Sequence, residues 1–222
     1  MNFDNLFYFD IETVGKHSTL EEFEKNDKTG YDLFIKKIEK KEWIGEPNDI
    51  YLSKSPLLPE YGKIICVSMS YYNKDDLKIL TKINDNESEL VKEVNNIFKK
   101  IGEKTINGLC GYFIKGFDIP WLNRKFLKYD LEIPKISKTF NIKPWESNIV
   151  DLYEMWKNYS SLENVSFDEM LYDLNIQNDN NINGSNIHDL YWGGHDLDKI
   201  KISCETNVKN YIEVTKKIIK NI

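Results

Sequence analysis

The sequence of 222 residues contains very little arginine and no excess of positive charge. Arg124 is its only arginine, so recognition of base pairs by bidentate arginine contacts is not expected. The formal net charge of −6 provides no overall positive field that would attract nucleic acid. Both features argue against a protein that recognises a specific sequence of duplex DNA.

Cysteines and long apolar runs are also scarce. Cys66, Cys110 and Cys204 are widely spaced and form no CxxC pair, which argues against a disulfide framework or a zinc site. No apolar run approaches the roughly 20 residues that a membrane span requires, and the N-terminal residues lack the features of a signal peptide. We therefore expect a protein without membrane association, in a reduced, cytoplasmic compartment of a bacterial, phage or viral-host type.

A strand-forming segment near the N-terminus, LFYFDIET at residues 6–13, carries Asp10 and Glu12. Because strand side chains alternate between faces, both carboxylates point the same way. Neighbouring carboxylates repel each other unless a cation lies between them or one takes up a proton. Hard oxygen ligands of this kind suit Mg²⁺ or Mn²⁺. A strand end that is acidic without function remains the simpler interpretation of this triplet alone.

A second acidic position follows about a hundred residues later, in GFDIPWL at residues 116–122. Gly116 permits a tight turn, and Pro120 is tolerated in the first turn of a helix. Asp118 is therefore expected at or near the start of a helix, where an aspartate is commonly only a cap. A metal-binding role becomes the favoured interpretation once this residue is taken together with the acidic strand.

Strand-like and helix-like segments alternate along the chain, which predicts an α/β layer fold. Expected strands lie at 6–11, 63–71, 77–83, 105–111 and 148–151, and expected helices lie at 87–101, 120–128, 152–158, 166–174 and 197–219. Residues 17–60 are expected to be a charged, mainly helical insertion with a lid or substrate-guiding role. Residues 176–186 are expected to be a loop, and Tyr191–Gly194 a turn with a packed aromatic residue. Without a repeat or a linker, residues 1–222 are interpreted as one domain.

FDIET at residues 9–13 followed by GFDIPWL resembles the DEDD-type 3′–5′ exonucleases, in particular stand-alone domains related to the exonuclease of family B DNA polymerases. The similarity extends to VDL at 150–152, SFDEML at 166–171 and SCETNV at 203–208. It implies a ribonuclease H-like fold with a mixed five-stranded sheet flanked by helices. It also implies hydrolysis with two Mg²⁺ or Mn²⁺ ions at the 3′ end of single-stranded or frayed DNA, with RNA as an alternative substrate.

The resemblance assigns roles to individual residues. Asp10 would bridge both metal ions, Glu12 would hold one ion and orient the attacking water, and Asp118 would hold the second ion. The fourth acidic position of the family corresponds to Asn207. The expected contacts to substrate are Thr13, Phe117 and Ser203.

Three positions depart from the family pattern. Asn207 offers one neutral oxygen but removes a negative charge, so one ion should bind less tightly. Ser203 replaces the tyrosine that orients water in the family, and Phe113 replaces a frequent asparagine. Glu205 lies roughly opposite Asn207 around the helix and is a poor substitute. Because Ser203 and Phe113 depart as well, natural divergence explains Asn207 better than an engineered substitution.

Two functions remain open from the sequence. One is a metal-dependent 3′–5′ exonuclease, active in DNA replication and proofreading, whose activity is reduced by Asn207. The other is a catalytically impaired domain on the same fold that binds nucleic acid or a replication protein. The intact acidic strand and Asp118 favour the enzyme, whereas Asn207, Ser203 and Phe113 favour the binding domain.

Overall fold

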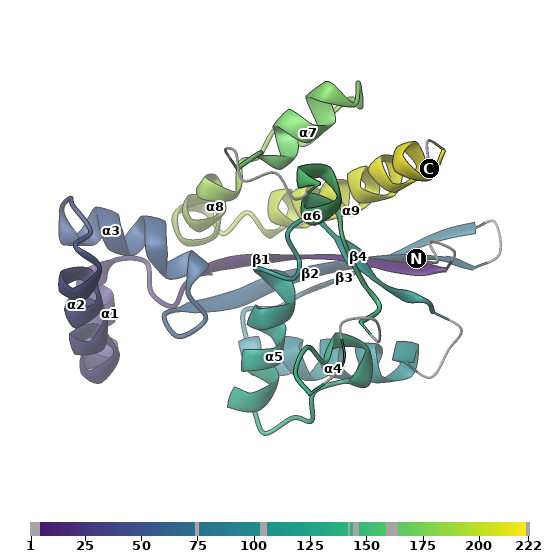
Figure 1. Ribbon diagram of the computed structural model, residues 1–222. Coiled ribbons are helices and arrows are strands. Elements are labelled where there is room, and N and C mark those ends of the chain that lie inside the picture. The colour runs from purple at the N-terminus through teal and green to yellow at the C-terminus, as the bar shows by residue number, and fades with distance from the viewer. Residues whose placement is uncertain are drawn as a thin grey trace.

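The computed structural model describes residues 5–73, 76–102, 106–141, 143, 147–158 and 164–220. Five strands in these ranges form one mixed sheet in the order β3-β2-β1-β4-β5 (Figure 1). Their bounds are β1 Leu6–Gly15, β2 Gly62–Asn73, β3 Asp76–Ile83, β4 Gly108–Gly111 and β5 Ile149–Asp151. β1 and β2 pair antiparallel, as do β2 and β3, whereas β1, β4 and β5 run parallel. The expected ribonuclease H-like arrangement is confirmed.

Helices cover both faces of the sheet, as Figure 1 shows with the sheet nearly edge-on. α4 (Glu87–Gly102) and α5 (Asp118–Lys128) pack on one face against alternate β1 residues, Phe7, Phe9 and Ile11. α9 (Leu197–Ile219) covers the other face, where it packs against Leu6 and Tyr8. α6 (Leu152–Lys157), α7 (Phe167–Asp173) and α8 (Ile187–Gly194) lie on the α9 side. The alternation of β1 therefore turns Asp10 and Glu12 towards α9.

Most of the predicted elements appear within a few residues of their expected bounds. The strand expected from Thr105 begins at Gly108, and Thr105 lies outside the described residues. The predicted turn at Tyr191–Gly194 is wrong, because these residues form the last part of α8. Ile187 and Tyr191 lie one turn apart on this helix and pack together in a core with α9 residues. The two glycines that suggested a turn are tolerated near the helix end, where His195 adopts the left-handed conformation with φ of 48°.

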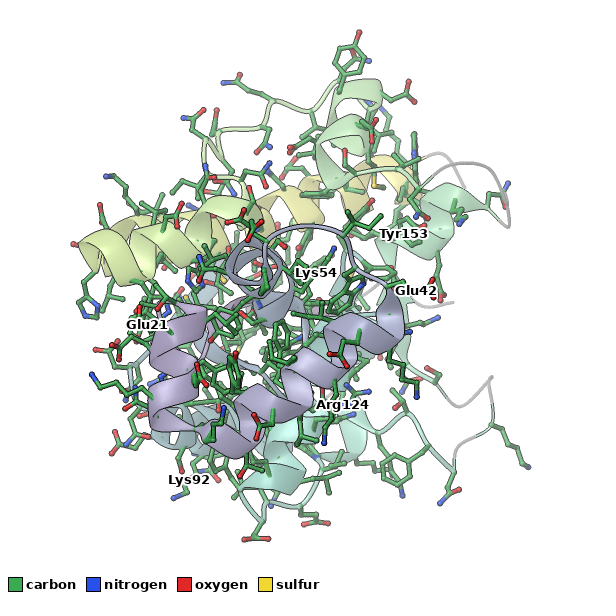
Figure 2. All side chains as sticks on the ribbon, turned by 90° about the vertical axis from the view of Figure 1, so that its left-hand side faces the viewer. Glu21, Glu42, Lys54, Lys92, Arg124 and Tyr153 are labelled. Atoms are coloured by element: carbon green, nitrogen blue, oxygen red, sulfur yellow. The ribbon has the colours of Figure 1, made fainter. Side chains whose placement is uncertain are left out.

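The insertion after β1 has an aromatic core of its own. It consists of three α-helices and a short 3₁₀ helix: α1 (Leu20–Asn26), α2 (Lys28–Lys41), α3 (Pro47–Lys54) and η1 (Ser55–Leu57). Phe23, Phe34 and Tyr51 are fully buried in a cluster that also includes Tyr61. The insertion lies at one end of the sheet (Figure 1), and Figure 2 looks onto it, with Glu21 and Glu42 at opposite sides.

Two further 3₁₀ helices, η2 (Lys135–Ser137) and η4 (Gly184–Asn186), complete the described elements. η4 lies in the segment that was expected to be a loop, just before α8. Among the described helices, none is long and apolar enough to cross a membrane.

Candidate active site

β1 places two carboxylates under α9 and then changes its pairing. Asp10 and Glu12 are buried, with exposed fractions of 7% and 8%. Glu12 lies opposite Cys66 of β2, but Thr13 lies opposite Ile64, so the register shifts between Glu12 and Thr13. Irregularities of this kind are common beside active sites, because they redirect the side chains that follow. The carboxylates thus lie at the last regular positions of the central strand.

A tight loop brings the third carboxylate to the same strand. Asp151 holds this loop by accepting the backbone N–H groups of Phe113 at 3.0 Å and Lys115 at 2.9 Å. α5 begins directly afterwards with Asp118. Instead of capping its own helix, Asp118 accepts the N–H of Ile11 through Oδ1 at 3.1 Å. Its carboxyl group is therefore fixed to the strand between Asp10 and Glu12.

α9 presents a line of three polar side chains, each four residues from the next, to these carboxylates. The Oγ of Ser203 donates to Glu12 at 3.4 Å. The Nδ2 of Asn207 donates to Asp10 Oδ2 at 3.1 Å, and the hydroxyl of Tyr211 donates to Asp10 Oδ1 at 2.6 Å. Tyr211 was not predicted from the sequence, although its spacing from Asn207 places it on the same helix face.

The three carboxyl groups share an electrostatic environment that disfavours their ionised forms. Burial raises the pKa of Asp10, Glu12 and Asp118, and the charge of Asp10 raises the pKa of the other two further. No lysine or arginine in the described ranges forms an ion pair with any of them. Buried carboxylates without a cationic partner need either a proton or a bound cation. The donor set is therefore suited to a divalent cation.

The ligand atoms indicate the class of cation. Oxygens of Asp10 and Glu12 and the sulfur of Cys204 all lie within 4.8 Å of one another. Burial raises the pKa of the Cys204 thiol well above its usual value, and its sulfur donates to the carbonyl of Asp10. A protonated thiol is a poor metal ligand. The carboxylate oxygens that remain are donors suited to a hard divalent cation.

A cavity of about 660 Å³ opens above the carboxylates. It is lined by Asp10, Ile11, Glu12, Leu57, Tyr112, Phe113, Phe117, Asp118, Tyr153, Asn164, Val165, Ser166, Phe167, Asp168, Asn178, Asn180, Ile182, Asn183, Gly184, Ser203, Asn207 and Tyr211. The walls are thus rich in aromatic rings and side-chain amides. None of these lining residues, which all belong to the described part of the chain, is basic.

The predicted substrate contacts differ in their placement. Phe117 and Ser203 line the cavity, together with the four residues assigned to the catalytic set. The hydroxyl of Thr13 donates to the carbonyl of Pro56 at 2.6 Å and so ties β1 to η1. The insertion reaches the cavity through Leu57, whose exposed fraction is 53%.

Two other groups lie away from the carboxylates. Glu205 accepts the hydroxyl of Thr81 on β3 at 2.6 Å, so it does not replace the missing fourth acid. His188 contacts the backbone of Gly15 and Ser18, and His195 pairs with Asp85 at 3.3 Å. Both histidines therefore make local contacts away from the carboxylates.

The greater part of the chain matches a known protein family. A protein-family model described as a predicted 3′–5′ exonuclease related to the exonuclease domain of PolB matches residues 56–214. The chain belongs to this family. The match includes Asp118, Ser203 and Asn207 of the candidate site, but it begins after Asp10 and Glu12, which line the same cavity. No curated protein matches the chain.

Proposed function

We propose that this chain is a metal-dependent 3′–5′ exonuclease that hydrolyses phosphodiester bonds at the 3′ end of single-stranded or frayed DNA. One observation carries the proposal. Asp10, Glu12 and Asp118 are buried beside one another, with no cationic partner among the described residues, at the base of an aromatic-lined cavity. Membership of the exonuclease family supplies the reaction class, and this donor set supplies the reason for metal dependence.

Asp10, Glu12 and Asp118 would supply the carboxylate oxygens that hold Mg²⁺ or Mn²⁺. When bound, divalent ions supply an activated water and neutralise charge on the scissile phosphate and the leaving oxygen. The protein's own part is to keep these ligands rigid. The N–H of Ile11 holds Asp118, and the hydroxyl of Tyr211 holds Asp10.

The cavity walls favour an unpaired 3′ end as substrate. Phe113 is 44% exposed at the cavity and packs edge-on against Tyr153, with ring centroids 5.1 Å apart. Nucleobases stack on such rings with little sequence preference. A base must leave its partner strand before it can stack there, which favours single-stranded or frayed ends. Removal of mispaired 3′ ends during DNA replication would be the corresponding biological role.

A second candidate function is a catalytically impaired domain that binds nucleic acid or a replication protein. Asn207 favours it, because the amide donates a hydrogen bond to Asp10 where an acid would help to hold a metal ion. Ser203 favours it too, because its short side chain contacts Glu12 only at 3.4 Å.

Degradation of single-stranded oligonucleotides labelled at either end, in Mg²⁺ and in Mn²⁺, tests both functions. We expect stepwise shortening from the 3′ end that is lost in Asp10→Ala and retained in Asp198→Ala, which changes an exposed acid on the same helix as Asn207. An inactive wild type with an active Asn207→Asp variant would support the impaired domain. If the wild type and the Asn207→Asp variant are both inactive in Mg²⁺ and in Mn²⁺, the proposed exonuclease activity is wrong. RNA oligonucleotides of the same sequence would show whether the 2′-hydroxyl is accepted.

A further inference from the structure

The loop between α7 and α8 sends one side chain to the polar face of α9. Asn180 lies on this loop, and its Oδ1 accepts the backbone N–H of Ile182 at 3.0 Å. Its Nδ2 donates to Ser203 Oγ at 3.0 Å and to Asn207 Oδ1 at 2.9 Å. Asn180 therefore contacts both residues that replace the family's tyrosine and fourth acid.

The direction of every hydrogen bond in this chain of amides is fixed from both ends. The backbone N–H of Ile182 can only donate, so the oxygen of Asn180 faces Ile182 and its NH₂ group faces α9. The oxygen of Asn207 must then face Asn180. At the other end, Asp10 in the ionised form that binds a cation can only accept, which requires the NH₂ group of Asn207 on that side. Both ends demand the same orientation of the Asn207 amide.

This orientation decides what Asn207 can do for a metal ion. The oxygen of an asparagine side chain is its only atom suited to a hard cation. That oxygen is engaged by Asn180, whereas the side facing Asp10 is an NH₂ group, which repels a cation. Asp10 thus receives a hydrogen bond in the place where the family pattern has a further ligand.

We propose that Asn180 is a positioning residue that holds Asn207 as a hydrogen-bond donor to Asp10, so that the site takes one divalent cation instead of two. The inference rests on the proposed function for its metal-binding carboxylates. It concerns the number of ions and the orientation of Asn207, and it can be tested without any measurement of cleavage.

The test is titration of the metal-free chain with Mn²⁺, with free Mn²⁺ followed by electron paramagnetic resonance. We expect one ion per wild-type chain. In Asn180→Ala the Asn207 amide can turn its oxygen towards the ion, so the affinity for Mn²⁺ should rise about tenfold, the size typical of a change beside metal ligands. Asn183→Ala is the matched control, because Asn183 lies in the same loop and lines the cavity but bonds to Ser185. It should bind Mn²⁺ like the wild type.

Asn207→Asp provides the second arm. Without metal, its new carboxylate would face Asp10 across the present 3.1 Å contact, and a second Mn²⁺ ion relieves this repulsion. We expect the Asn207→Asp variant to bind two ions per chain. Its melting temperature in EDTA should be lower than that of the wild type, and it should rise more when Mn²⁺ is added. A wild type that binds two ions or none, or an Asn180→Ala variant indistinguishable from Asn183→Ala, would overturn the inference. A wild type that binds one ion but cleaves no DNA would refute only the proposed activity.

Discussion

At the scale of single residues, burial and charge act in the same direction on Glu12. Burial raises its pKa, and the neighbouring charge of Asp10 raises it further, well above the usual value. The folded chain therefore binds a proton at Glu12 over a pH range in which the unfolded chain has released it. The metal-free protein should lose stability as the pH rises from the unfolded pKa of about 4.3 through the higher folded value.

Substitution of Glu12 by glutamine removes this penalty, because the amide cannot ionise and can still accept from Ser203. We expect Glu12→Gln to melt at a higher temperature than the wild type in EDTA at pH 8, with a smaller difference at pH 5. Each kcal/mol corresponds to about 2–4 °C for a chain of this size. Glu213→Gln, an exposed change on α9, should show no such gain. Equal melting temperatures of wild type and Glu12→Gln at pH 8 would refute the argument.

At the scale of elements, a buried ion pair joins both helices of one layer to the sheet. Glu87, in the first turn of α4, accepts the N–H of Ile64 at 2.8 Å and pairs with Lys125 of α5 at 2.8 Å. Lys125 also donates to the carbonyl of Gly62 at 2.7 Å, and its side chain is 1% exposed. Burial alone would raise the pKa of Glu87, but Lys125 and the other donors outweigh it and lower the pKa.

Loss of one partner would leave Glu87 buried with its main counter-charge removed. We expect Lys125→Met to reduce the free energy of unfolding by about 3–5 kcal/mol, measured by urea denaturation. Arg124→Met is the matched control, because Arg124 is the preceding residue and forms a solvent-exposed pair with Glu60 at 3.3 Å. It should cost about 1 kcal/mol or less. Similar losses in the two variants would show that the buried pair does not hold this layer together.

Some of these elements and site residues could be predicted from the sequence, and others could not. The strands and the helix at 87–101 follow from apolar spacing, and strand alternation alone puts Asp10 and Glu12 on one face. Tyr191–Gly194 was mispredicted because two glycines suggested a turn where tertiary packing of Tyr191 extends a helix. Asn180 could not have been found, since its role depends on how a loop crosses a distant helix.

At the scale of the whole molecule, the charge distribution limits how the chain can bind nucleic acid. The net charge is −6, and none of the described residues that line the cavity is basic. Phosphates therefore find no lysine or arginine among the described lining residues, and few condensed counterions should be released on binding. Affinity should depend instead on bound divalent cations and on stacking against rings such as Phe113.

This argument can be tested by measuring how a single-stranded oligonucleotide binds across a range of KCl concentrations at constant Mg²⁺. The measurement uses the Asp118→Asn variant, in which cleavage should be suppressed. With about two phosphates or fewer neutralised by side chains, the slope of log K against log salt should be no steeper than about −1.4. A further Phe113→Ala change should weaken binding by about 1–3 kcal/mol without altering the slope, because stacking releases no counterions. A slope of −3 or steeper would mean that lysines outside the cavity hold the strand, and that the charged surface, not the aromatic wall, is the main binding surface.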